Sequence, residues 1–193
     1  MAEAKLLGVE EFQKQIRGGV RPNLFQVNHK FPTGITGVGE EDVAYLCKSA
    51  SLPASTVGTV ELPFRGRVIK VPGDRTFESW TATFYNEDSW KLRGAYESWI
   101  GLTNAVNANA ATSSVDKASE DISVLQLDKF KSTKNTPEAI RTYTLIGAFP
   151  VSVSQISVAF DNNDSYEEFD VEFAYQYFTS TGGTNELKKV TIA

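Results

Sequence analysis

The sequence predicts a mainly β member of the α+β class: an antiparallel β-sandwich or barrel with one packed helix. In residues 166–178, apolar side chains occupy every second position and mostly acidic side chains fill the gaps. Successive side chains of a strand point to opposite faces, so this pattern is typical of a strand with one apolar and one acidic face. Shorter alternating stretches surround a single long helical pattern, and that order favours the α+β class.

The composition limits the classes to which the protein can belong. Of the 193 residues, 41% are hydrophobic and 22% are charged, which is typical of a globular chain. We find no internal boundary and expect one domain over residues 1–193. The net charge of −5 is not the positive charge that is typical of nucleic-acid-binding proteins. One cysteine and one histidine exclude an intrachain disulfide framework and argue against a zinc site.

The chain lacks the sequence motifs of the common enzyme classes. We find no P-loop, no G-x-G-x-x-G and no G-x-S-x-G motif. Asp161, Asn163, Ser165 and Glu172 match EF-hand positions, but Tyr166 stands where the calcium loop requires glycine. We therefore expect a structural or binding protein with no catalytic residue, metal or cofactor.

Targeting and membrane patterns are also absent from the sequence. No run approaches the roughly 18 apolar residues of a membrane span. The first residues lack the apolar core of a signal peptide. We expect a soluble protein made in a cytosol, without membrane contact.

The first quarter of the chain predicts one helix and two strands. Apolar residues at helical spacing predict an amphipathic helix over residues 5–17, ended by two glycines. Alternation over 24–31 predicts a strand, in which His29 is expected to be a packed residue and not a general base. Alternation over 43–47 predicts a second strand.

Residues 49–66 do not follow a single periodic pattern. Prolines and glycines interrupt this stretch, which is too long for a tight hairpin turn, and we expect only part of it to pair. A short strand over 67–71 is expected to end in a turn at 72–74, and a long strand follows over 75–85. Exposed apolar loops mark interaction sites, so the apolar side chains of 49–66 predict a contact with another protein surface. These side chains are Leu52, Val57, Val60, Leu62 and Phe64.

A helix is predicted over residues 86–100. Asn86 is a candidate N-cap for this helix. Trp90, Tyr96 and Trp99 lie on one stripe, so we expect them to pack on the sheet as core residues.

The second half of the chain is predicted to be mainly strands. Residues 102–121, rich in Ala, Asn and Ser, predict an exposed and partly helical surface excursion. Residues 179–193 form a polar C-terminal extension. Further strands, separated by breaks at 131–137 and 149–150, are predicted over 122–130, 141–149 and 154–160.

The acidic face of the strand at 166–178 consists of Glu168, Asp170 and Glu172. No Lys or Arg occurs between Thr142 and Leu187, so this face is expected to have no local counter-charge. A glycosidase places two carboxylates across a cleft, whereas these three lie on one strand. The face therefore either meets solvent or serves a function that requires negative charge.

Five short stretches occur in one order and together cover most of the chain. They are RPNLFQV at 21–27, CKSASLP at 47–53, PGDRTF at 72–77, SWTAT at 79–83 and FDNND at 160–164 with the strand that follows. In combination they resemble the tail tube proteins of contractile-tailed (myovirus-type) bacteriophages. Residues 102–121 and 179–193 look longer than in short members of that family, and the family pattern assigns them no role.

The resemblance implies a structural virion protein that is not an enzyme. Family members form homohexameric rings whose strands pool into one closed barrel, and the rings stack into the inner tube of the contractile tail. The tube is the conduit for genome ejection into the host, and DNA passes through without specific binding. The implied partners are further copies of the chain, the tail sheath protein, and the baseplate and tail-terminator proteins. The implied location is the virion tail, after assembly in the host cytoplasm.

The resemblance also suggests roles for the residues singled out above. Glu168, Asp170 and Glu172 are expected to line the lumen, and the competing placement has them facing the sheath. The stretch 49–66, with the N-terminal helix, is expected to contact the next ring. Two alternatives stay open: the inner tube of a contractile injection or secretion system, and a monomeric β-sandwich binding module with a solvated acidic face.

Overall fold

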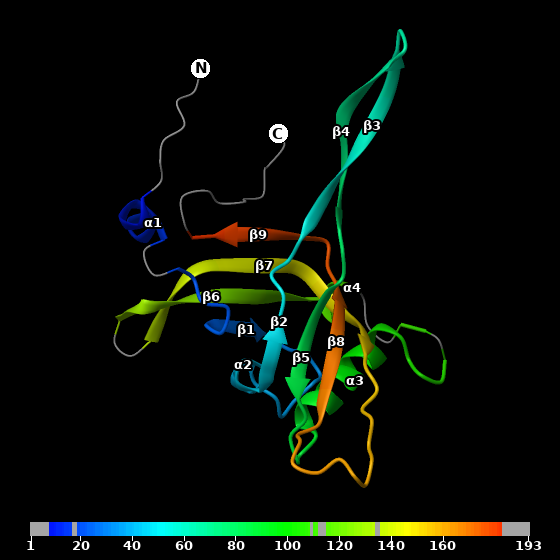
Figure 1. Ribbon diagram of the computed structural model, residues 1–193. Coiled ribbons are helices and arrows are strands. Elements are labelled where there is room, and N and C mark those ends of the chain that lie inside the picture. The colour runs from blue at the N-terminus through cyan, green and yellow to red at the C-terminus, as the bar shows by residue number, and fades with distance from the viewer. Residues whose placement is uncertain (1–7, 17–18, 109, 112–114, 134–135, 183–193) are drawn as a thin grey trace.

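The computed structural model describes residues 8–16, 19–108, 110–111, 115–133 and 136–182, and its architecture is mainly β (Figure 1). These residues form one curled seven-stranded sheet and a separate two-stranded hairpin that projects from it. All pairings in both are antiparallel. The predicted α+β class, dominated by antiparallel strands, is confirmed.

Six strands of the large sheet are hydrogen-bonded in the order β1 (Phe25–His29), β6 (Glu120–Thr133), β7 (Thr136–Val153), β8 (Glu168–Ala174), β5 (Trp80–Tyr85) and β2 (Cys47–Ala50). The seventh strand, β9 (Tyr177–Thr181), also pairs with β7. The separate hairpin consists of β3 (Ser55–Phe64) and β4 (Arg67–Phe77).

Strand β7 belongs to both halves of the curled sheet. Its residues 136–148 pair with β6, and 142–146 also pair with β9, whereas 149–153 pair with β8. Gly147 lies at the change of partner with φ of 62°, a conformation that glycine adopts without steric cost. The predicted break at 149–150 is wrong, because Pro150 lies within β7, opposite Phe173.

The stretch 166–178 forms two strands and not one. β8 and β9 both run along β7, and Tyr175 and Gln176 form the corner between them opposite the bend at Gly147. The Gln176 amide N–H donates to the Ile146 carbonyl at 3.1 Å. Burial therefore changes phase, from odd positions ending at Phe173 to the even position Phe178.

Four helices accompany the described strands: α1 (Val9–Ile16), α2 (Glu40–Leu46), α3 (Lys91–Thr103) and α4 (Val115–Ala118). Helix α2 replaces the predicted strand over 43–47, and β2 begins only at Cys47. Glu40, Glu41 and Asp42 fill the first turn of α2 and favour a helix start. The Gly39 N–H donates to the Asp42 carboxylate at 2.8 Å.

The core lies between α3 and one face of the sheet. Tyr96 and Trp99 of α3 are fully buried there. Trp90 does not join them: it is 51% exposed and precedes α3 at the N-cap position with φ of 54°. Strands β5 and β8 supply the facing layer, namely Trp80, Ala82, Phe84, Phe169, Val171 and Phe173.

Two further expectations differ from the structure. Residues 154–160 are irregular and not a strand, with Phe160 fully exposed. The excursion is exposed at 106–108, as predicted, but Ala118 in α4 is buried and its carbonyl accepts a hydrogen bond from the Trp99 indole. Most of the extension at 179–193 lies outside the described residues, and Thr179–Thr181 belong to β9.

Candidate functional site

The β3–β4 hairpin is exposed to solvent along almost its whole length. Its strands pair from Ser55–Phe77 at the base to Phe64–Arg67 at the tip. Arg65 and Gly66 have φ of 46° and 79°, which is the geometry of a two-residue type I′ turn. The stretch 49–66 thus does lead into a tight hairpin turn, contrary to the prediction. At ~3.3 Å per residue, the ten residues of β3 extend the hairpin by roughly 30 Å.

The predicted turn at 72–74 lies inside β4 instead. Pro72 has no N–H to donate. A two-stranded ribbon tolerates a proline, because each of its strands has one edge without a neighbour. Gly73 crosses Gly58 of β3 so closely that a Cβ at Gly73 would lie 3.2 Å from the Gly58 carbonyl oxygen. The pairing register shifts beside this glycine pair, between Val57 and Thr59.

The hairpin exposes apolar side chains along both strands. A two-stranded hairpin is marginally stable in water without a further packing surface, and no described residue of the chain covers these side chains. Leu52, just before β3, is 48% exposed. The exposed fractions within the hairpin are 44% for Val57, 50% for Val60, 50% for Leu62, 59% for Phe64, 56% for Val68 and 51% for Ile69.

The acidic face lies on the side of the sheet opposite α3. Glu168, Asp170 and Glu172 alternate with the buried Phe169, Val171 and Phe173 of β8. The Thr83 hydroxyl donates to Asp170 at 2.7 Å, and the Ser152 hydroxyl donates to Glu172 at 3.3 Å.

The expectation that this face has no local counter-charge is wrong. Lys48 Nζ, on β2, lies 2.6 Å from the Glu168 carboxylate and reaches it across β5. The hydrogen bond to Glu168 raises the pKa of Lys48. The two residues are 120 positions apart in the chain, so local composition could not reveal the pair. Negative charge still prevails on this face.

Helix α1 forms a second apolar surface. Its residues Val9, Phe12 and Ile16 are 75%, 63% and 50% exposed, and none of its residues is buried. They share one side of the helix because positions three and four apart lie together.

His29 is a packed core residue. Its Nε2 lies 2.8 Å from the Tyr96 hydroxyl, and its Nδ1 lies 3.0 Å from the Lys30 carbonyl oxygen. The ring contacts Phe31, Tyr96, Trp99 and Phe173. Burial lowers the pKa of His29 from 6.5 to about 4, so the imidazole is neutral at pH 7.

The described residues contain no group of three or more His, Cys, Asp or Glu side chains placed to hold a metal ion. Within the same residues, no helix is long and apolar enough to cross a membrane.

Sequence reasoning missed a surface at residues 154–167. This segment connects β7 to β8 and exposes Val158, Phe160 and Tyr166 by 79%, 109% and 85%. The polar run Asp161-Asn162-Asn163-Asp164 indicated a turn, but the alternation before it suggested a strand and obscured the apolar exposure.

Known proteins resemble this chain in sequence. The family model described as "Phage tail tube protein" matches residues 20–181. The tail tube protein of Enterobacteria phage T4 is 27% identical over 158 residues, which span 82% of this chain and 90% of that protein. The tail tube protein of Serratia phage KSP90 is 28% identical over 160 residues, spanning 82% and 87% of the two chains.

Solved structures share the fold. A chain in the tube-terminating cap of the anti-feeding prophage superposes with a TM-score of 0.59 at 17% identity, covering 85% of this chain and 91% of that chain. A chain in the sheath–tube complex of the PVC extracellular contractile injection system superposes with a TM-score of 0.57 at 17% identity, covering 88% and 97%. The family match over residues 20–181 spans both halves of the curled sheet and the hairpin, and the chain therefore belongs to the phage tail tube protein family.

Proposed function

We propose that the chain is the structural subunit of the inner tail tube of a contractile phage tail. Hexameric rings of the subunit stack into a tube that conducts the genome into the host. Membership of the tail tube family and relatives named tail tube proteins in phages T4 and KSP90 support this role. The family is structural, and no catalytic activity is assigned to the chain.

One observation carries the proposal beyond family membership: the β3–β4 hairpin exposes apolar residues on both strands. A ribbon roughly 30 Å long needs a packing partner, and a neighbouring ring supplies one. Residues Leu52, Val57, Val60, Leu62 and Phe64 form this stacking contact, together with the apolar side of α1. Oligomer contacts bury such surfaces, which monomers rarely expose.

The acidic face lines the lumen in this proposal. The opposite face of the sheet is covered by α3, so a wall one subunit thick exposes Glu168, Asp170 and Glu172 on its other side. Proteins bind DNA non-specifically when Lys and Arg neutralise phosphates and release counterions. A surface with more carboxylates than cations repels phosphates instead, so genomic DNA passes without specific binding.

The remaining assignments concern partners and location. The tube contacts the tail sheath, the baseplate and the tail terminator, and it is a virion component assembled in the host cytoplasm. Solved neighbours come from a baseplate, a tube cap and a sheath–tube complex of other contractile systems. Residues 1–193 form one tail-tube domain, with residues 106–108 on the outer surface.

A second candidate is the inner tube of a contractile injection or secretion system, which would carry proteins. The shared fold with the anti-feeding prophage and PVC chains favours it. Sequence identity is higher to phage proteins, which favours the phage tail. Capsid genes beside the sheath and baseplate genes would decide for the phage tail, and their absence for the injection system.

Electron microscopy of the purified chain at high concentration tests the proposal. We expect six-fold rings and stacked tubes in negative stain. Featureless monomeric particles at every concentration would contradict it.

A further inference from the structure

The 154–167 loop and the β3–β4 hairpin lie at opposite ends of the subunit. In the β5–β8 pair, Trp80 stands opposite Phe173 and Tyr85 stands opposite Glu168. The hairpin precedes Trp80 at one end of this pair, and the loop precedes Glu168 at the other. Figure 1 shows the hairpin pointing up from the sheet and the loop, drawn in yellow and orange, at the bottom.

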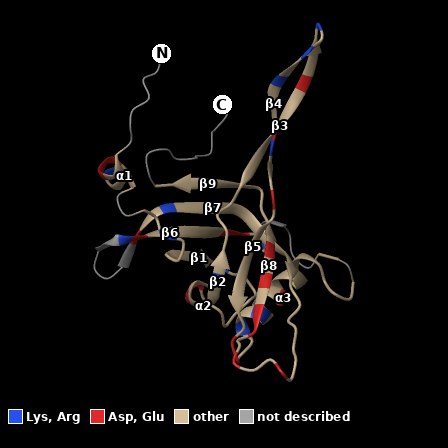
Figure 2. Ribbon diagram, viewed as in Figure 1, with Lys and Arg blue, Asp and Glu red and all other residues tan. Residues whose placement is uncertain are grey.

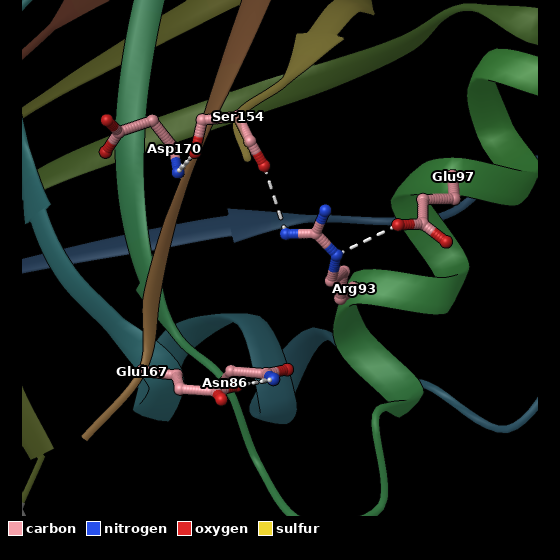
Figure 3. Close-up of polar contacts among 6 residues, drawn as sticks. All are labelled: Asn86, Arg93, Glu97, Ser154, Glu167 and Asp170. Atoms are coloured by element: carbon pink, nitrogen blue, oxygen red, sulfur yellow. Dashed lines mark hydrogen bonds and ion pairs between the residues drawn. The ribbon is translucent and has the colours of Figure 1, made fainter. Parts of the chain in front are cut away.

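Hydrogen bonds fix the N-terminal end of the loop. Arg93 of α3 donates to the Ser154 carbonyl at 3.1 Å and also pairs with Glu97 at 2.9 Å (Figure 3). The Asp170 N–H donates to the Ser154 hydroxyl at 2.8 Å, and the Ser154 N–H donates to the Asp170 carbonyl at 2.8 Å.

The C-terminal end is fixed as well. Asn86, in the β5–α3 connection, donates its backbone N–H to the Glu167 carbonyl at 2.9 Å and its side-chain amide to the Glu167 carboxylate at 2.8 Å (Figure 3). Ile156 packs against the core from within the loop. The loop is therefore held at both ends and presented as a defined surface.

The loop combines exposed apolar side chains with a concave surface. A pocket of ≈ 430 Å³ is lined by Ile156, Val158, Tyr166 and neighbouring loop residues. Phe160 stands fully exposed nearby in the same loop, and Trp90 is half exposed at the start of α3. Large apolar side chains around a concave surface are typical of a protein-binding site.

Charge distinguishes the two ends. The loop carries Asp161, Asp164 and Glu167, and the β5–α3 connection adds Glu87 and Asp88, with no Lys or Arg in either segment. The hairpin is basic at its tip through Arg65 and Arg67, while nearer its base Lys70 and Arg75 balance Glu61 and Asp74. Figure 2 shows blue at the hairpin tip and short red stretches on the otherwise tan loop at the bottom.

We propose that the 154–167 loop is the receiving surface on which the β3–β4 hairpin of a second copy docks, in the adjacent ring. This inference rests on the proposed function, since it requires stacked rings. Apolar residues of the hairpin cover Val158, Phe160 and Tyr166, while Arg65 and Arg67 meet Asp161 and Asp164. The contact joins two different surfaces of the chain, and such a head-to-tail interface generates an open stack.

Charge reversal on both sides tests the inference. The variant Asp161→Arg/Asp164→Arg and the variant Arg65→Asp/Arg67→Asp each place like charges together, and we expect either to raise the concentration needed for tubes by about tenfold or more. Combining all four substitutions in one chain restores opposite charges, and tubes should return. Asp-Gly is itself a favourable type I′ turn, so the hairpin variant should keep its fold.

Matched controls make the result specific. Glu41→Arg/Glu138→Arg changes the net charge equally at exposed positions outside the loop and should leave tube assembly unchanged. Phe160→Ser removes the apolar contact without a charge change and should also reduce stacking. Ultracentrifugal pelleting and negative-stain images measure tubes and rings separately.

The outcomes separate this inference from the function beneath it. Single rings without tubes in the loop and hairpin variants, with recovery in the combined chain, support it. Normal tubes from both Asp161→Arg/Asp164→Arg and Phe160→Ser overturn the docking proposal and leave the tube function standing. If these variants form normal tubes but no longer bind the sheath, the loop is a sheath contact instead. A wild-type chain that forms neither rings nor tubes overturns both.

Discussion

At the scale of single residues, the core of α3 follows from helical spacing, but its beginning does not. Tyr96 and Trp99 recur on one side of a helix, and both are fully buried. The same spacing placed Trp90 in the stripe, yet α3 begins after it, at Lys91. The Asn86 side chain donates a hydrogen bond to Glu167, a residue distant in sequence, and does not cap the helix. No local pattern contains that information.

The two tryptophans should therefore differ sharply in their contribution to stability. Trp99→Ala removes a fully buried ring and the indole hydrogen bond to Ala118, and we expect a loss of about 3–5 kcal/mol of unfolding free energy. Trp90→Ala removes a half-exposed ring and its cation–π contact with Arg93, and should cost under about 1 kcal/mol. Urea unfolding of the unassembled chain measures both. Equal losses would contradict the assignment of Trp90 to the surface.

His29 should make the stability of the unassembled chain depend on pH below neutrality. Its pKa is about 4 when folded, against 6.5 as the unperturbed value. Between these values the unfolded chain binds a proton that the folded chain does not. The unfolding free energy should therefore have its full value above about pH 6.5. It should fall by up to about 3 kcal/mol as the pH drops to 4.

The variant His29→Gln provides the comparison, since its amide does not titrate in this range. Urea unfolding at pH 7.5, 6 and 5 should show a smaller loss for this variant than for the wild type. Identical pH profiles would show that burial of the imidazole does not control the loss.

At the scale of elements, the strands with regular alternation were predictable, and the errors occur where tertiary contacts override a local pattern. Pro72-Gly73-Asp74 has the composition of a turn, but Gly73 and Gly58 cross each other within the ribbon. The strand suggested over 43–47 is a different kind of error, because a second local signal, the acidic first turn, starts helix α2 there. The lysine facing the acidic strand comes from β2, which local composition could not show.

Shortening the hairpin should separate assembly from folding. Glu61 and Lys70 are paired directly, with a 3.5 Å ion pair, so replacing residues 62–69 by Asn-Gly closes a shorter ribbon in register. The large sheet does not include this segment, and its circular dichroism spectrum should persist while tubes are lost. Negative-stain images give the readout.

A control variant keeps the full ribbon. Glu61→Gln/Lys70→Gln removes only an exposed ion pair, which contributes little, and tubes should still form. Tubes of normal length from the shortened chain would rule out the hairpin as the stacking element.

At the scale of the whole molecule, the net charge of −5 conceals an uneven distribution, and the lumen assignment depends on that distribution. Because Lys48 already offsets Glu168, the effective negative charge of the face rests on Asp170 and Glu172. Sequence alone identified these carboxylates and their common face. Whether these carboxylates face the lumen depends on how the subunits are arranged around the symmetry axis, and no local sequence pattern specifies that arrangement.

Reversing these two charges should slow DNA passage. Phage with tubes of Asp170→Lys/Glu172→Lys should eject DNA slowly or incompletely, because each ring would then hold phosphates. Higher salt should relieve the defect as the screening length falls from about 10 Å at 0.1 M to about 3 Å at 1 M. Single-particle ejection assays measure the rate.

The isosteric pair Asp170→Asn/Glu172→Gln removes the negative charge without adding a positive one, so its ejection rate should lie between the other two. Unchanged ejection in the lysine variant, together with lost sheath binding, would place this face on the outside of the tube.

Strand β7 also bears on how the chain folds. It pairs with β6 and β9 before the bend at Gly147 and with β8 after it, so both halves of the sheet share one covalent strand. Neither half closes its hydrogen-bond ladder until β7 is in place, and the partners of β7 come from both sides of it in sequence. We infer that the described sheet unfolds in a single all-or-none transition, with no stable half-molecule.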